Sequence, residues 1–341
     1  MYALKPQLHE RHRQHKRGTM RTMALDITSR CNMNCPKCYA ETFRDVPEID
    51  IDILAKTFDE AFAMGVFHYI IQGGEVLEAR DRLESVLKSC HPDATYLNVV
   101  SNGWHMTADT IAWLKHLQVD KITISLDSGI EAEHDAGRLP GSYRRAIRAV
   151  DQILAAGLFV GVSTVVTHQS LYSEGFQQIH AYTKRKRVRL EVQVAEPVGK
   201  WDGRKDILIT PEDASFIKEL YRTTPRLPNG DVAVKRDIFD TEKDYCPAAT
   251  EFMSITAAGE LLPCNFLQFS LGNIKDKTLT EMRNAILPNP WFTDDHPYCI
   301  IGENHKFIDQ YVTAYVDAPK PLNAYEVFGL SHSSAPFQEK I

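Results

Sequence analysis

Three closely spaced cysteines are the first residues in this sequence that could carry out chemistry. Cys31, Cys35 and Cys38 lie in the stretch "CNMNCPKC", directly after a short apolar run. A structural zinc site usually needs four closed ligands, and this loop offers three thiols without a second cysteine pair or a nearby histidine. A cubane iron-sulfur cluster also takes four thiolates, so three would leave one iron open to another ligand. The spacing therefore favours an iron-sulfur cluster over zinc, and both over a purely structural thiol cluster.

Composition limits the class of protein to which this loop can belong. The chain has 341 residues, a formal net charge of -6 and 43% hydrophobic residues. These values are ordinary for a soluble globular protein, and nothing in them predicts a nucleic-acid partner. No apolar run is long enough for a membrane span, and no signal peptide follows the basic start, so we expect a cytoplasmic protein. In that compartment seven cysteines favour metal binding or reactive thiols over disulfides.

The elements that must position the cysteines alternate between strands and helices. Short β-branched runs predict strands at 22–28, 66–72, 95–101, 121–127, 158–167 and 188–196. Windows with helical periodicity predict helices between them, at 52–65, 81–90, 108–118 and 142–157, the last one capped by Ser142. Continuous apolar strands joined by crossover helices indicate a parallel sheet that is buried on both faces. We therefore expect an α/β fold built on an open or partial (β/α)6 barrel.

In such barrels the reactive groups gather where the carboxyl ends of the strands open into loops. Each of the first four predicted strands is followed by polar or glycine residues, which we expect to converge on one rim. These rim residues are Cys31, Cys35, Cys38, Gly73, Gly74, Glu75, Ser101, Asn102, Gly103, Ser125, Asp127 and Ser128.

The cysteine loop resembles the signature of the radical S-adenosylmethionine (radical SAM) superfamily, and "GGEV", "SNG" and "ISLDS" resemble its other cofactor motifs. The resemblance covers roughly residues 22 to 200. It implies a [4Fe-4S] cluster on the three cysteines, with S-adenosylmethionine chelating the unique iron. Gly73, Gly74 and Glu75 would bind its amino group, and Ser101 and Ser125 its carboxylate or ribose. Two positions depart from the family pattern: Lys37 stands where an aromatic residue is usual, and Val76 where proline is common.

The last third of the chain contains a second group of cysteines. A strand, a turn at Gly259 and another strand between Cys246 and Cys264 predict a hairpin that brings the two thiols together. The C-x12-G-x4-C spacing resembles the SPASM extension, in its short form called Twitch. That resemblance implies an auxiliary [4Fe-4S] cluster on Cys246, Cys264 and Cys299. The fourth ligand stays open, with these candidates: Asp294, Asp295, His296, Glu303 and His305.

The same patterns suggest a division of the chain. Residues 1–21 would be a basic arm, mobile or loosely docked, and residues 22–200 the barrel. Residues 201–235 would be a connector whose helix begins at Thr210 and Pro211. The auxiliary-cluster domain would span 236–305, with a β-hairpin and helices, and a C-terminal helix and tail would span 306–341.

The resemblance implies an enzyme that reductively cleaves S-adenosylmethionine to a 5′-deoxyadenosyl radical and abstracts a hydrogen from its substrate. Oxidation, epimerisation, decarboxylation or elimination could follow, and no catalytic residue can be assigned. A flavodoxin- or ferredoxin-type protein would donate the electron. Only about twenty residues precede the first strand, which favours a small metabolite such as a sugar, aminocyclitol or nucleoside over a ribosomally made peptide. The rival classes are a non-catalytic iron-sulfur or zinc regulator and a SAM-binding scaffold without activity.

Overall fold

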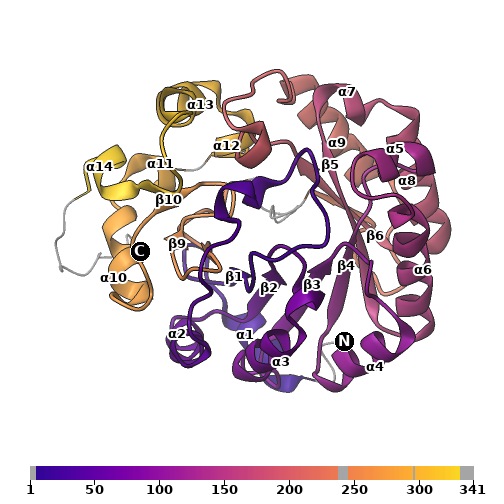
Figure 1. Cartoon of the computed structure of the whole chain (residues 1–341), viewed down its shortest axis with the longest axis horizontal. Coiled ribbons are helices and arrows are strands. Elements are labelled where there is room, and N and C mark those ends of the chain that lie inside the picture. The colour runs from indigo at the N-terminus through magenta and orange to yellow at the C-terminus, as the bar shows by residue number, and fades with distance from the viewer. Residues whose placement is uncertain (1–4, 237–244, 295, 331–341) are drawn as a thin grey trace.

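The computed structural model describes residues 5–236, 245–294 and 296–330. Its main feature is a curved sheet whose six central strands run parallel to one another (Figure 1). The apolar runs form these strands because both faces of the sheet are covered. The strands are β1 (Thr22–Asp26), β2 (His68–Gln72), β3 (Tyr96–Ser101), β4 (Lys121–Ser125), β5 (Phe159–Val166) and β6 (Arg189–Val194). The predicted partial barrel is therefore confirmed.

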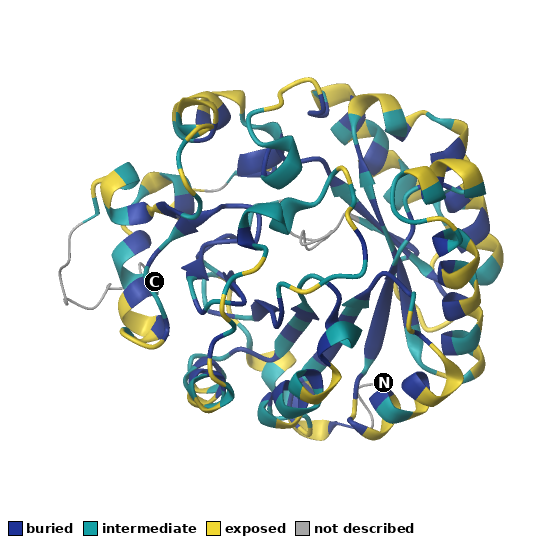
Figure 2. Cartoon of the chain, viewed as in Figure 1, coloured by how far each residue is buried: buried dark blue, intermediate teal, exposed yellow. Residues whose placement is uncertain are grey.

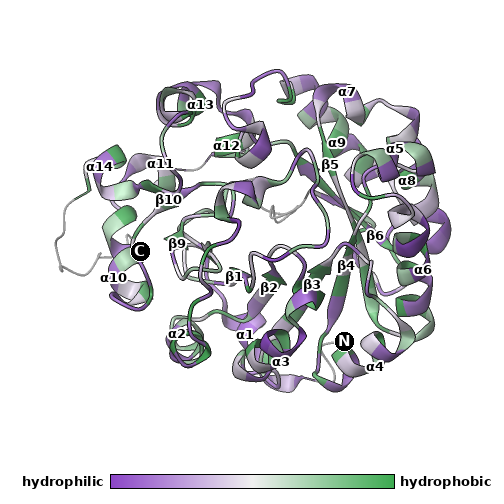
Figure 3. Ribbon diagram, in the orientation of Figure 1, coloured by the Kyte–Doolittle hydropathy of each residue, from purple (hydrophilic) through white to green (hydrophobic). Residues whose placement is uncertain are grey.

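Helices cover the outer face of this sheet in an arc (Figure 1). Each turns an apolar stripe inward and a charged face outward, as the colouring by burial and by hydropathy shows (Figures 2 and 3). The covering helices are α2 (Ile51–Ala63), α3 (Arg80–Ser89), α4 (Ala108–His116), α6 (Ser142–Ala155) and α8 (Glu174–Lys186). Two short helices, α5 (Glu131–Ala136) and α7 (His168–Leu171), follow β4 and β5 at the rim.

The N-terminal side of α6 differs from the sequence prediction. Gly141, with φ of 83°, takes the N-cap position, and Ser142 is the first helical residue. The cap is supplied from a distance by Asp135, whose carboxylate accepts the N–H groups of Gly141 (2.6 Å) and Tyr143 (2.8 Å). Its Oδ1 also accepts the Ser142 hydroxyl at 3.1 Å. Ser142 therefore donates to the true cap instead of being the cap itself.

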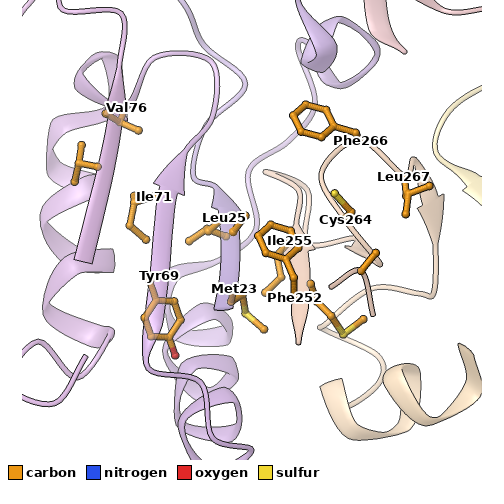
Figure 4. Close-up of a cluster of buried hydrophobic side chains, with 14 of the residues drawn as sticks. Met23, Leu25, Tyr69, Ile71, Val76, Phe252, Ile255, Cys264, Phe266 and Leu267 are labelled. Atoms are coloured by element: carbon orange, nitrogen blue, oxygen red, sulfur yellow. The ribbon is translucent and has the colours of Figure 1, made fainter. Parts of the chain in front are cut away.

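The sheet continues beyond the six predicted strands at both edges. β7 (Val234–Arg236) pairs parallel with β6, and β8 (Phe252–Ile255) pairs parallel with β1. β8 then turns into β9 (Leu261–Leu262), which runs antiparallel to it, so the predicted hairpin is confirmed. Figure 4 shows side chains of β1, β2 and β8 packed into one continuous core. The C-terminal segment thus shares the sheet of the barrel.

The remaining C-terminal elements pack around this hairpin. β10 (Phe269–Ser270) pairs with β11 (Leu322–Asn323), which joins the tail to the hairpin region. The helices here are α10 (Leu279–Ile286), α11 (Pro290–Thr293), α12 (Ile300–Glu303), α13 (His305–Tyr311) and α14 (Ala324–Phe328). In the connector, α9 (Pro211–Thr223) begins as predicted, with Thr210 in a capping box.

The basic N-terminal segment is firmly docked, contrary to the expectation of a mobile or loosely docked arm. It forms helix α1 (Pro6–Gln14), in which Leu8 is fully buried. Lys5 is buried too, and its Nζ donates to the backbone carbonyls of Thr95 and Gln118 and to Asp120 at 2.6 Å. Lys5 therefore anchors this segment beside the starts of β3 and β4.

In the described parts of the chain, no helix combines the length and the apolar character that a membrane crossing requires.

Candidate functional site

A cavity of about 200 Å³ lies at the carboxyl ends of the strands, under the loop that follows β1. That loop, drawn in indigo, crosses the end of the barrel (Figure 1). Ten of the twelve predicted rim residues line the cavity, because parallel strands bring their carboxyl ends to one edge. They are Cys31, Cys35, Cys38, Gly73, Gly74, Glu75, Ser101, Asn102, Ser125 and Asp127, whereas Gly103 and Ser128 do not line it.

The three thiols of the β1 loop form a donor set that suits a metal cluster. Burial, together with the negative charges of Glu75, Cys35 and Cys38, raises the pKa of Cys31 to about 11. Burial likewise raises the pKa of Cys38. Such thiols ionise when a metal supplies positive charge. Among the described residues no three such ligands lie close enough for a single ion. Cubane thiolates bind separate irons and lie farther apart.

A hydrogen-bond donor without a partner, beside the thiols, also agrees with a metal cluster at this loop. The Asn32 side-chain nitrogen is buried and has no hydrogen-bond partner among the described residues. Its Oδ1 accepts a hydrogen bond from Asn102 Nδ2 at 2.8 Å, which ties the end of β3 to the cysteine loop. A buried amide donor normally has an acceptor, and sulfur atoms of a bound cluster would supply one. Sequence reasoning placed Asn102 at a strand end but did not foresee this link.

The glycine loop after β2 lies directly on the cysteine loop. Gly73 has φ of 149°, and the N–H groups of Gly74 and Glu75 donate to the carbonyls of Thr28 and Arg30, both at 2.8 Å. A Cβ on Gly74 would lie 2.1 Å from the Arg30 carbonyl oxygen, closer than any side chain tolerates. Glycine is therefore required here so that two backbones can meet beside the thiols.

Glu75 and Ser101 are engaged within the protein. The Glu75 carboxylate accepts the Ser101 hydroxyl at 2.8 Å and the backbone N–H groups of Asn102 at 2.7 Å and Leu77 at 3.2 Å. Burial raises its pKa, and these donors oppose the rise. Both side chains thus hold the end of β3 in place. Ser125 differs, because it lines the cavity and no described residue hydrogen-bonds its hydroxyl.

A buried ionic network forms another part of the cavity wall. Asp127 accepts Arg138 Nε at 2.5 Å and Lys37 Nζ at 2.6 Å. The two cations hold the pKa of Asp127 well below its usual range and outweigh its desolvation. The network was not predicted, because nothing in the local pattern links the cysteine loop, the end of β4 and Arg138.

Tyr39 connects the cysteine loop to the C-terminal hairpin. Its hydroxyl donates to Asp26 at 2.8 Å and accepts from Gln72 at 2.9 Å. Its ring packs edge-on against Phe266, with 5.2 Å between centroids. Burial raises the pKa of Asp26 to about 6, partly offset by these hydrogen bonds. Tyr39 follows Cys38 and Phe266 follows Cys264 closely in sequence, so this contact joins the two groups of cysteines.

The C-terminal cysteines surround the hairpin and the end of β6. The pKa of Cys264 is raised by burial and by the charges of Cys246 and Glu196, which lie close by. The N–H of Cys246 donates to the His296 carbonyl at 2.9 Å, which brings the stretch containing Cys299 alongside. Figure 4 places Cys264 at the hairpin beside Phe266. The thiols can therefore form a second site, separate from the main cavity.

The fourth-ligand candidates for this second site have different surroundings. Glu303 accepts the N–H of Cys299 at 2.6 Å and so fixes the start of α12. His296 has a buried Nε2 without a hydrogen-bond partner among the described residues. Asp294 and His305 are exposed, and Asp295 lies outside the described residues. Glu196, buried on the cavity wall near Cys264, is a further carboxylate that sequence spacing could not reveal.

Comparisons with known proteins agree with this geometry. Residues 25–179 match the radical SAM superfamily, and residues 246–295 match SPASM, an iron-sulfur cluster-binding domain. An AdoMet-dependent heme synthase from Methanosarcina barkeri is 22% identical over 77% of this chain and 81% of its own. A PqqA peptide cyclase from Methylocella silvestris is 24% identical over 76% of this chain and 73% of its own.

The crystal structure of Streptococcus suis SuiB bound to its precursor peptide SuiA has a similar fold. The TM-score is 0.61 at 16% identity, covering 81% of this chain and 65% of the SuiB chain. The present chain therefore spans less than two thirds of SuiB. The two matched domains bring [4Fe-4S] clusters and S-adenosylmethionine as cofactors. Together these findings identify the chain as a member of the radical SAM superfamily with a C-terminal SPASM domain.

Proposed function

We propose that this radical SAM enzyme modifies a peptide, with Cys31, Cys35 and Cys38 holding the cluster that binds S-adenosylmethionine. The observation that carries the proposal is the cavity in which these thiols meet the glycine loop and the strand ends. A peptide is favoured because similar proteins are named for peptide substrates, among them PqqA peptide cyclase. They support a peptide better than the small metabolite that the sequence alone favoured.

In this proposal different rim residues bind different parts of S-adenosylmethionine. Backbone carbonyls of Gly73 and Gly74 take the amino group of S-adenosylmethionine, since the N–H groups of Gly74 and Glu75 are already used. Glu75 acts with Ser101 to fix the end of β3, and Ser125 offers its hydroxyl to the carboxylate or ribose. The cofactors, once reduced by a flavodoxin- or ferredoxin-type donor, supply hydrogen abstraction through a 5′-deoxyadenosyl radical.

We further propose that Cys246, Cys264 and Cys299 hold an auxiliary [4Fe-4S] cluster. Cys264 and Cys299 are almost fully buried, which limits the access of water to a cluster bound there. The Tyr39 and Phe266 rings form the wall between this site and the cavity. A substrate in the cavity would thus lie between the two groups of cysteines, so that it could lose a hydrogen on one side and an electron on the other.

A second candidate substrate is a tetrapyrrole, as handled by the AdoMet-dependent heme synthases. The observation that favours it is that the heme synthase from Methanosarcina barkeri aligns over 81% of its length, more than the peptide cyclase does.

The proposal is tested by measuring 5′-deoxyadenosine after anaerobic reconstitution and reduction with dithionite. We expect the wild type to form it and a Cys31→Ala/Cys35→Ala/Cys38→Ala variant not to. Cys90→Ala is the matched control, because Cys90 is a buried thiol that does not line the cavity. Stoichiometric zinc, or an iron-loaded protein that binds S-adenosylmethionine without cleaving it, would contradict the proposal. Peptides and tetrapyrrole precursors are then compared by mass change of the substrate.

A further inference from the structure

Lys37 occupies a position where the superfamily signature usually has an aromatic residue, and most of its side chain is shielded from solvent. Its side chain is 15% exposed, and its Nζ lies 2.6 Å from Asp127 Oδ1. Arg138, 12% exposed, binds the same carboxylate through Nε at 2.5 Å and through its Nη2 at 3.2 Å. Two largely shielded cations therefore share one largely shielded anion, which leaves a surplus of one positive charge in the network.

Among the described residues, Asp127 is the one carboxylate that forms an ion pair with Lys37 or Arg138. His134 accepts the backbone N–H of Asp127 through Nδ1 at 3.1 Å, and burial lowers its pKa to about 4, so it is neutral near pH 7. Glu133 accepts the Ser128 hydroxyl at 2.6 Å, and Asp135 caps α6. Neither carboxylate forms an ion pair with Lys37 or Arg138. An uncompensated charge that is shielded from water is unfavourable, so this wall favours an anion in the cavity opposite it.

The thiols of the cysteine loop are the anions that this wall faces. Lys37, Arg138 and the three cysteines line the same cavity. Burial lowers the pKa of Lys37, and the charges of Asp127 and Cys35 oppose this fall. The pKa of Arg138 is raised, because the charges of Asp127, Cys35 and Cys31 outweigh its desolvation. A 2+ cubane core on three thiolates has a net charge of about -1, and one added electron makes it about -2. The surplus positive charge therefore attracts the oxidised cluster, and it attracts the reduced cluster more strongly because that cluster carries one more negative charge.

We infer that Lys37 is a positioning residue that raises the reduction potential of the cluster on Cys31, Cys35 and Cys38 through its fixed charge. Asp127 holds Lys37 against the loop and moderates that charge. The inference rests on the proposed function, because it requires a cluster at these cysteines. The step is the gain of one electron by the cluster from an external low-potential reductant, and no bond to protein is made or broken. Net charge around a cluster is one of the factors that set its potential.

The test is a redox titration of the reconstituted full-length protein, followed by electron paramagnetic resonance. The signal to follow is the one that changes when S-adenosylmethionine is added, which separates this cluster from the auxiliary one. We expect a more negative midpoint potential in Lys37→Met and a value near wild type in Lys37→Arg. Lys200→Met is the matched control, because Lys200 pairs with Asn34 of the same loop from its surface and should change the potential less.

A fully iron-loaded Lys37→Met protein with the wild-type potential would overturn the inference. If Lys37→Met does not load iron, Asp127→Asn decides, because removal of the carboxylate leaves both cations and should shift the potential upward. An unchanged potential in Asp127→Asn would then overturn it. Absence of iron or of the signal in the wild type would instead count against the proposed function, so the two failures are distinguishable.

Discussion

Asp26 offers a quantitative test of the wall between the two cysteine groups. Its carboxyl is buried, and its pKa is raised from an ordinary value of 3.8 to about 6. The folded protein therefore binds a proton more tightly than the unfolded chain does. The stability of the fold with Asp26 protonated is therefore fully present below pH 3.8 and is lost as the pH rises through about 6. At 1.36 kcal/mol for each pKa unit, the ionised carboxylate costs the fold about 3 kcal/mol at pH 8.

Replacing Asp26 with asparagine removes this charge while it keeps an oxygen that can accept the Tyr39 hydroxyl. We expect Asp26→Asn to be more stable than the wild type by about 1–3 kcal/mol at pH 8, since the new amide hydrogens offset part of the gain. Near pH 4 the gain should vanish, because the carboxyl is then protonated in the folded wild type.

The measurement is urea unfolding of the iron-free, thiol-reduced protein between pH 4 and 8, with the two variants compared at each pH. The difference between the two proteins at each pH removes the contributions of the other titrating groups, which both proteins share. Asp93→Asn, a change in an exposed carboxyl, controls for the loss of a surface charge. A stability difference for Asp26→Asn that does not change with pH, or that decreases towards pH 8, would refute the reasoning.

Three further predictions follow from the loops and the hairpin. Gly74→Ala should lose about four irons per chain, because its Cβ would clash with the Arg30 carbonyl. Gly137→Ala, whose Cβ would lie 3.4 Å from its nearest neighbouring atom, should keep them, and iron analysis of both variants tests this. Asp135→Ala should lower the free energy of unfolding by about 1–2 kcal/mol in urea, because α6 loses its cap. Cys264→Ala should also lose about four irons yet still form 5′-deoxyadenosine, since the site on the β1 loop is separate; loss of that activity would contradict two independent sites.

The sequence predicted the barrel well because its signals are local. Each strand is a short β-branched run, and parallel strands place their following loops at one rim whatever the details of packing. For that reason the strand pattern alone assigns Cys31, Gly74 and Ser125 to one rim. The hairpin between Cys246 and Cys264 was predictable for the same reason, since a glycine turn between two apolar runs defines it.

Contacts between distant segments could not be predicted, because no short-range pattern encodes them. The ion pair of Lys37 with Asp127 joins residues that are far apart in sequence, as does the burial of Lys5 against Asp120. The sequence predicts a mobile or loosely docked arm around Lys5 and shows Lys37 only as a departure from the family pattern. Glu75 shows a related limit, because the family resemblance implied a role in binding the cofactor but could not reveal its hydrogen bonds to Ser101 and Asn102.

The pairing of β8 with β1 has a consequence for the integrity of the protein. β1 is buried along its whole length, and β8 satisfies the backbone groups on one of its sides. Without β8, the strand that leads into the cysteine loop would become a bare edge, able to pair with another copy and aggregate. Truncation before residue 252 would therefore do more than delete the proposed auxiliary site, because it would uncover the strand from which the cysteine loop extends.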